Sequence, residues 1–359
     1  MSYKSWPIEP PWLGQISEVP ATETGPGGFD EVTNFFCVRG RLQTRPKLNT
    51  FVSAPDGLPI YLMRSYKDVN GSLHTLVVTT KTAYHLTDAA GTPTLNALNF
   101  PAGVTDLSST NRPFGVAAVL NRVYFSNGET KVLYADGSDT LKIAGDVPGG
   151  ARFLAVIGGH LVLAFVKESS TNYSNRIRWS AIGVPNSYEH YTAGSTNLFE
   201  VPDDITGAVG ASRSGFIFRT NGLTMVTATG VAVAPLAFEN FATEPEGVGN
   251  VYPYSLAAYG NRFVVFVADD DIYKVLLPEF VPIGGLARKA IFDDIALANG
   301  PIVGKIVPNL GVGYPFLSYW LSIPKASNSV TWVYSLSEQS WTRFVAAGAL
   351  TSLSTVYIV

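Results

Sequence analysis

The side chains best suited to binding a transition metal are four histidines and one cysteine. They are spread along the chain as His74, His85, His160, His190 and Cys37. No two of them have the short intervals typical of a zinc site, so a site would need ligands from distant positions. We therefore expect packed or surface histidines, no bound metal and no cofactor. A single cysteine also excludes a disulfide within the chain.

Acidic runs offer a second kind of chemistry, because carboxylate oxygens bind calcium. The runs are Asp203-Asp204, Asp269-Asp270-Asp271 and Asp293-Asp294. Calcium needs six to eight oxygens in a shaped loop, and the Asp-x-Asp-x-Asp-Gly pattern of such loops is absent from the sequence. The Asp269–Asp271 run lies between two strand-like segments, which favours a solvated hairpin turn.

Glycoside cleavage is the main enzymatic alternative, because several glycosidases are β-propellers. It needs paired carboxylates, or an arginine cluster with a tyrosine and an acid. The Ser-x-Asp-x-Gly-x-x-Trp boxes of many sialidases are missing, and so are Gly-x-Ser-x-Gly elbows and phosphate-binding glycine loops. Aromatic residues make up 12% of the chain, and at alternating strand positions they are first of all core residues. We predict that the protein is not an enzyme.

The elements that would position these side chains are short strands in a repeating arrangement. Each unit has two apolar strands, a turn with glycine or asparagine, and a more polar third strand. The segment Val-Ala-Ala-Val-Leu-Asn-Arg-Val-Tyr-Phe, from residue 116, compares well with Leu-Ala-Ala-Tyr-Gly-Asn-Arg-Phe-Val-Val-Phe, from residue 256. Six units recur at the spacing of propeller blades: Leu58–Leu86, Gly115–Tyr134, Leu154–Ser180, Ile205–Thr227, Tyr254–Leu277 and Tyr314–Phe344.

The predicted fold is therefore all-β, a single β-propeller of six blades within a range of five to seven. The 34 glycines and 23 prolines are distributed along the chain, which suits many tight turns. Residues 31–359 form the propeller in this interpretation. The strand-like end, residues 353–359, is expected to pair near residues 35–48 and close the ring, because closure removes exposed sheet edges.

Residues 1–30 are expected to form an extended arm, because they are rich in proline and glycine and show little strand periodicity. Trp6, Trp12 and Leu13 would be costly to leave in water. They pack either on their own propeller or on an adjacent subunit, and in the second case they are candidate interface residues.

Two segments carry a resemblance to a known group of proteins. Residues 176–188 read Arg-Ile-Arg-Trp-Ser-Ala-Ile-Gly-Val-Pro-Asn-Ser-Tyr, a strand that breaks at Gly183 and Pro185. Residues 38–46 read Val-Arg-Gly-Arg-Leu-Gln-Thr-Arg-Pro. Both segments resemble β-propeller virion proteins of tailed bacteriophages, in which arginine-containing strands lead into such turns.

This resemblance implies a structural component of the virion in the tail nozzle, neck or hub. It implies a homo-oligomer, with a hexameric ring favoured, docking on an adjacent ring of other virion proteins around the path of DNA ejection. Arg39, Arg41 and Arg45 are then candidates for non-specific contact with the phosphates of packaged DNA. On alternating strand positions they also suit a solvated face or intersubunit salt bridges. The expected location is the tail or neck of a virion, after synthesis in the cytoplasm of the bacterial host.

Charge and hydropathy restrict the alternatives. The net charge is −3 and no lysine or arginine block is present, so general attraction to nucleic acid is not expected. Charged residues make up only 15% and hydrophobic residues 46%, which allows a large core and apolar contact surfaces. No apolar stretch is long enough for a membrane-spanning helix, so membrane insertion is not expected.

Two other functions remain open from the sequence. One is a carbohydrate-binding or carbohydrate-cleaving propeller, such as a receptor-binding tail component. The other is a bacterial propeller scaffold unrelated to any virus.

Overall fold

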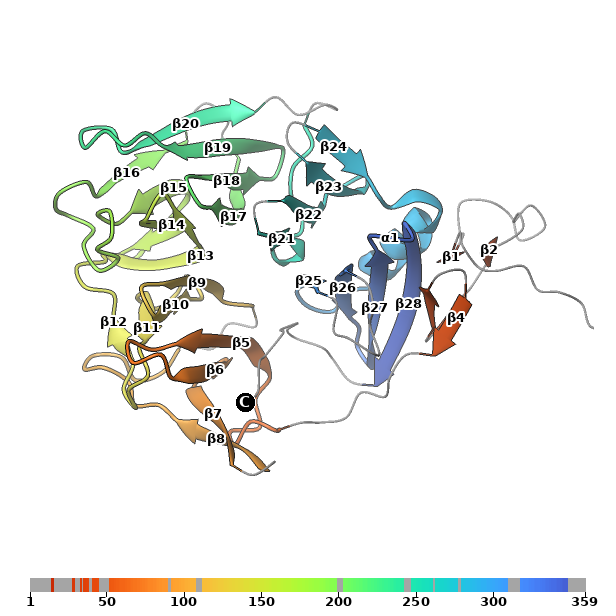
Figure 1. Cartoon of the computed structure of the whole chain (residues 1–359), viewed down its shortest axis with the longest axis horizontal. Helices are drawn as coiled ribbons and strands as arrows, with labels where there is room; N and C mark the ends of the chain where they lie inside the picture. Colours follow the sequence, from red (N-terminus) through yellow and green to blue (C-terminus); the bar gives the residue numbers. More distant parts are fainter. Residues whose placement is uncertain are drawn as a thin grey trace, which may run out of the picture.

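The chain is a six-bladed β-propeller in the computed structural model, which confirms the predicted fold. Six four-stranded antiparallel sheets surround a central axis (Figure 1). The structure describes residues 14–15, 28–29, 33, 35–38, 41–44, 52–89, 92–107, 112–198, 203–241, 247–260, 262–276, 279–308 and 317–347.

Each blade consists of four strands that are consecutive in the sequence and in the sheet. Blade one contains β5 (Ile60–Lys67), β6 (Leu73–Thr79), β7 (Ala83–Ala89) and β8 (Thr92–Ala97). Blade two contains β9 (Gly115–Val119), β10 (Arg122–Ser126), β11 (Leu133–Ala135) and β12 (Lys142–Ile143). Blade three contains β13 (Gly149–Ile157), β14 (His160–Glu168), β15 (Thr171–Trp179) and β16 (Gly194–Asn197).

The second half of the ring repeats this arrangement. Blade four contains β17 (Ile205–Ala211), β18 (Ser214–Arg219), β19 (Gly222–Ala228) and β20 (Leu236–Phe241). Blade five contains β21 (Ala257–Tyr259), β22 (Phe263–Val267), β23 (Ile272–Leu276) and β24 (Glu279–Pro282). Blade six contains β25 (Val303–Val307), β26 (Ser318–Pro324), β27 (Asn328–Ser335) and β28 (Ser340–Ala347). The first strand of each blade lies nearest the axis (Figure 1).

The six predicted units match the six blades, but each unit contains only three of the four strands. The outer strands of blades one to five were missed because they are short or polar; β12 has only two residues. In blade six the missed strand is the inner one, β25, whose sequence Val-Gly-Lys-Ile-Val has a glycine and a lysine in place of an apolar run.

The hydrophobic core lies between neighbouring blades, since the central strands are covered on both faces. In β14, for example, the residues from His160 to Val166 are all buried. Five apolar clusters join blades one and two, two and three, three and four, four and five, and five and six. Among the described residues, no comparable cluster joins blade six to blade one. We call this junction the seam.

Among the described residues near the N-terminus, four short strands lie outside the six blades. β1 (Gly14–Gln15) pairs in parallel with β2 (Gly28–Phe29), and β3 (Phe35–Val38) pairs antiparallel with β4 (Arg41–Thr44). β1 and β3 lie against β28, and Figure 1 places them outside blade six. The strand expected at residues 353–359 falls outside the described residues, so ring closure by that strand stays a prediction. The division between an arm at residues 1–30 and a propeller at residues 31–359 also stays a prediction.

In the residues that the structure describes, helical structure is confined to short connections: two 3-10 turns, η2 (Pro253–Ser255) and η3 (Gly285–Ala287), and one α-helix, α1 (Arg288–Ala296). Helix α1 follows blade five and buries Ile291 and Ile295 in the cluster between blades five and six. In the described part of the chain, no helix has the length and apolar character needed to cross a membrane.

Candidate interaction surfaces

Most of the interface and phosphate-contact residues chosen from the sequence fall outside the described residues. These are Trp6, Trp12, Leu13, Arg39 and Arg45. Arg41 begins β4, where its backbone pairs with Val38. The roles of these residues therefore stay predictions.

The histidines and acidic runs have structural contacts. No group of three histidine, cysteine or carboxylate side chains within the described ranges is placed to hold a metal ion. His160 is buried, and its Nδ1 lies 2.6 Å from the carbonyl oxygen of Ser180. Of the acidic run in the hairpin of blade five, Asp271 is buried rather than solvated; it accepts hydrogen bonds from the backbone amides of Ile272 and Gly284. Burial raises the pKa of Asp271 above its ordinary value.

Strand β15, which contains the first residues of the segment 176–188, carries an ion-paired cluster on its less buried face. Arg176 and Arg178 alternate with buried residues along β15, so both reach the same side of the sheet. Arg176 Nη1 lies 2.6 Å from Glu168 Oε2, and Arg178 Nη1 lies 3.2 Å from Glu168 Oε1. The Arg176 guanidinium also lies over the ring of Tyr173, at 3.7 Å from its centroid. These arginines therefore stabilise blade three.

The Trp-Ser pair that ends this strand fixes the loop that follows. Trp179 donates its indole N–H to the carbonyl of Thr192 at 3.0 Å. Ser180 is fully buried, and its hydroxyl oxygen accepts a hydrogen bond from the amide of Leu161 at 2.9 Å. The start and the end of the loop 180–193 are thus both tied to the blade. The sequence suggested a structural role for this segment, and these contacts agree with it.

The middle of this loop exposes apolar side chains. The amide of Ala181 donates to the carbonyl of Ser187, which closes the Ile-Gly-x-Pro turn. Ile182 and Val184 project from it as exposed residues, and Tyr191 further along is 89% exposed. The loop is therefore well ordered by its hydrogen bonds and apolar at its tip.

A groove of about 750 Å³ lies between this loop and blade four. It is lined mainly by small and apolar residues from four connections of blades three and four. We call it the blade three–four groove. Its lining includes Ile182 and Thr192 from the loop 180–193, Ser212 and Arg213 from the β17–β18 turn, and Val231 and Pro235 from the β19–β20 turn. Beside it, Val233 in the β19–β20 turn is 95% exposed.

Two consecutive glycines form the floor of this groove. Gly158 has φ +59°, and a Cβ there would lie only 2.2 Å from the Cβ of Ala228. The amide of Gly158 donates to the carbonyl of Ser212 in blade four, and the carbonyl of Gly159 accepts from the amide of Gly183. Only glycine allows this close approach. Through these two hydrogen bonds, the β13–β14 turn connects blade four to the loop 180–193.

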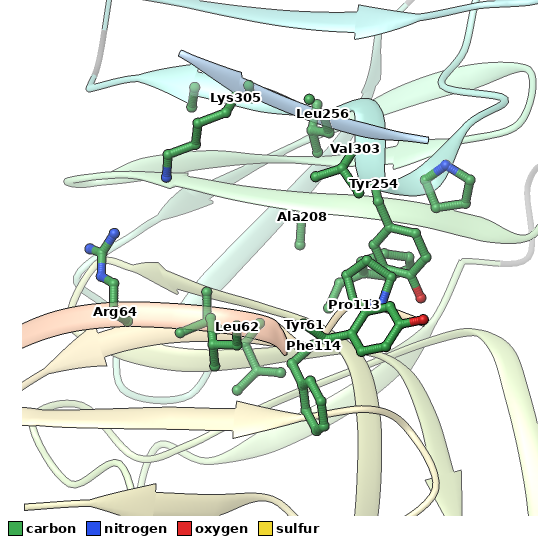
Figure 2. A pocket seen from close by; sticks show the side chains of 18 of the residues that line it. Tyr61, Leu62, Arg64, Pro113, Phe114, Ala208, Tyr254, Leu256, Val303 and Lys305 are labelled. Atoms are coloured by element: carbon green, nitrogen blue, oxygen red, sulfur yellow. The ribbon is translucent and has the colours of Figure 1, made fainter. Parts of the chain in front are cut away.

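A second cavity, of about 260 Å³, lies on the propeller axis. Inner strands of all six blades contribute to its lining, as do η2 and the segment before β9. Figure 2 shows its walls: the side chains of Leu62, Ala208 and Val303 lie around the middle of the space, and Tyr61 and Tyr254 lie at one end. Arg64 and Lys305 lie at the other end. We call this space the axial cavity.

Comparisons with known proteins identify the fold only. No protein-family model matches the chain, and no curated protein matches it. Among solved structures, it is similar to BamB from Moraxella catarrhalis at 12% identity, covering 84% of this chain and 78% of that one with a TM-score of 0.42.

Two further structures are longer proteins. The chain is similar to the dihydro-heme d1 dehydrogenase NirN at 13% identity and a TM-score of 0.42, covering 87% of this chain and 57% of that one. It is similar to an extracellular domain from a B. thetaiotaomicron one-component system at 11% identity and a TM-score of 0.43, covering 77% of this chain and 32% of that one. What these diverse proteins have in common with this chain is the propeller fold.

Proposed function

We propose that the protein is a non-enzymatic structural component of a tailed-phage virion, placed in the tail nozzle, neck or hub. The observation that carries the proposal is the segment 176–188. It resembles phage propeller proteins in sequence, and the loop that it begins forms one wall of the blade three–four groove. An apolar groove beside exposed valine and tyrosine side chains suits a protein partner.

The partner we propose for this groove is the N-terminal segment of a neighbouring copy, with Trp6, Trp12 and Leu13 as its anchors. Figure 1 places β1, which directly follows this segment in the chain, outside blade six and across the ring from blade three. A donor and an acceptor on opposite sides of one subunit give a head-to-tail contact, and such contacts form a ring when the rotation between neighbours closes.

The test is the native mass of the full-length protein by light scattering, with electron-microscope class averages of the same fraction. We expect a ring of several subunits, with a hexamer favoured. Val233→Asp should reduce the ring to monomers, because it places a charge beside the groove, and so should the Trp6→Ala, Trp12→Ala double variant. Each should keep the unfolding temperature of the wild type.

Val69→Asp is the matched control, since Val69 is an 82% exposed valine in the β5–β6 turn of blade one, away from the groove. This variant should assemble normally. A wild-type protein that is monomeric at all concentrations would contradict self-assembly. Rings that survive both groove and arm substitutions would contradict the proposed contact.

The carbohydrate-binding alternative has one observation in its favour, the exposed ring of Tyr191 beside the groove. Exposed aromatic rings stack on sugars. Screening the protein on a glycan array, with Tyr191→Ala in parallel, separates the two functions. Saturable binding that is lost in the variant would favour the receptor-binding role.

A further inference from the structure

The axial cavity contains two cationic side chains that face each other across the seam. Arg64 comes from β5, the inner strand of blade one, and Lys305 from β25, the inner strand of blade six. Both line the cavity, and Figure 2 shows their charged ends on the same side of it. The two blades therefore bring together like charges from distant parts of the sequence.

Neither cation has an acidic partner among the described residues. Lys305 is half-buried, and burial lowers its pKa below the ordinary value; the Arg64 guanidinium lowers that pKa further, and no carboxylate opposes the two effects. Two cations of blades two and three, in contrast, share a carboxylate. Arg112, just before the cavity-lining Pro113, lies 3.5 Å from Glu129, and Lys167 lies 2.6 Å from the same carboxylate.

The surroundings of Lys305 make its charge costly without an anion. Leu62, Leu256 and Val303 line the cavity nearby, so the charges lie against an apolar wall. Lys305 is half-buried and loses hydration there, whereas Arg64 is exposed, and the two like charges repel each other. An oxyanion between them would offset both costs with charge-assisted hydrogen bonds.

We propose that Arg64 and Lys305 form a binding site for the phosphate or carboxylate group of a small molecule. The volume of about 260 Å³ is just below the roughly 300–1,000 Å³ of pockets for drug-sized ligands, which favours a small metabolite over a polymer. The apolar and tyrosine side chains at the other end would contact the rest of that molecule. This inference does not depend on the proposed virion role, because it concerns a different surface.

The experiment is isothermal titration calorimetry of the full-length protein at low ionic strength and pH 7. Inorganic phosphate and citrate are the two probes, and they distinguish a phosphate ligand from a carboxylate ligand. Lys305→Gln and Arg64→Gln should each weaken binding at least about tenfold, the loss expected for one charge-assisted hydrogen bond. Lys305→Arg should retain binding within about threefold, because it keeps the charge.

Lys67→Gln is the matched control, because Lys67 is an exposed lysine on the same strand as Arg64 and does not line the cavity. Its affinity should equal that of the wild type. The proposal is overturned if neither probe binds at millimolar concentration, or if binding survives both glutamine substitutions. A short single-stranded DNA that binds through these two residues while phosphate and citrate do not would also overturn it.

Discussion

Blade six contains two opposite arrangements of charge. On its outer side, Asp294 of α1 is buried and accepts hydrogen bonds from Lys325 at 2.6 Å, Trp332 at 2.8 Å and Arg343 at 3.0 Å. On its inner side, Lys305 faces Arg64 without a carboxylate among the described residues. The first arrangement holds a helix to a sheet. The second leaves positive charge directed into a cavity, where it can bind an anionic ligand.

This comparison teaches how to separate structural charges from functional ones in a fold without recognisable catalytic motifs. Where every ionic group has its partner, as at Asp294 or at Glu168 in blade three, the cluster is explained by stability. Where a charged group in a cavity wall has no ionic partner among the described residues, removing its charge is expected to raise the free energy of unfolding rather than lower it. Substitutions at Asp294, Glu168 and Lys305 test that difference.

The largest effect is expected at Asp294. Burial by itself raises the pKa of this carboxyl, but the hydrogen bonds from Arg343, Lys325 and Trp332 outweigh burial and lower the pKa below its ordinary value. Asp294→Asn leaves two cations without an anion and should reduce the free energy of unfolding by about 3 kcal/mol, measured by urea denaturation.

The same residue predicts a pH dependence. Because its folded pKa lies below the unfolded value, Asp294 contributes stability above a pH of about 4, and this contribution is lost as the pH falls through the folded pKa. The asparagine variant should lack this part of the acid transition. Asp293→Asn is the control: Asp293 is exposed and pairs with Lys289 one helical turn away, so its cost should stay below about 0.5 kcal/mol. Equal effects at both positions would refute the arrangement described for α1.

A smaller effect is expected at Glu168, which joins Arg176 and Arg178. Glu168→Gln should lower the free energy of unfolding by about 1 kcal/mol, because the three side chains are partly exposed and solvent replaces part of the interaction. Glu189→Gln, at an exposed position in the neighbouring loop, should cost nothing measurable. Urea denaturation of both variants checks this, and a neutral Glu168→Gln would show that the arginine pair needs no anion.

The smallest effect, with the opposite sign, is expected at Lys305. Lys305→Met removes a half-buried charge beside Arg64 and should raise the free energy of unfolding by about 0.5 kcal/mol in buffer without oxyanions. Since the folded pKa of Lys305 lies below that of an unfolded lysine, wild-type stability should rise with pH between the two values, and the methionine variant should lack this rise. Differential scanning calorimetry with and without phosphate adds a second readout: phosphate should stabilise only the wild type. If Lys305→Met were less stable than the wild type in phosphate-free buffer, Lys305 would be a stabilising charge like those at Asp294 and Glu168.

The blades were predictable from the sequence because their central strands are buried on both faces. Runs such as Leu161–Val166 are apolar throughout, and asparagine-glycine turns separate several of them. The outer strands were not predictable in the same way. Their residues alternate between exposed and half-buried, and their pairing depends on an edge that only the third strand of the blade provides.

The sites were harder to predict than the fold. Arg64 and Lys305 are ordinary residues of two strands far apart in the sequence, and only the arrangement of the blades around the axis brings them to one cavity. The blade three–four groove was missed for the same reason, although the segment 176–188 drew attention to one of its walls. One signal was available. The short strand-like run Val-Gly-Lys-Ile-Val contains a lysine, and burying a charged side chain is costly. A lysine in such a run therefore indicates a functional position.

The contiguity of each blade has a consequence for how the chain folds during synthesis. Because all four strands of a blade are consecutive, each sheet can form as soon as its own segment has left the ribosome, with contacts that are local in sequence. Blades one to five can stack in order as they emerge. The seam is different, because it joins the first blade made to the last one. The axial cavity and its pair of cations therefore come into existence only in the final step of folding.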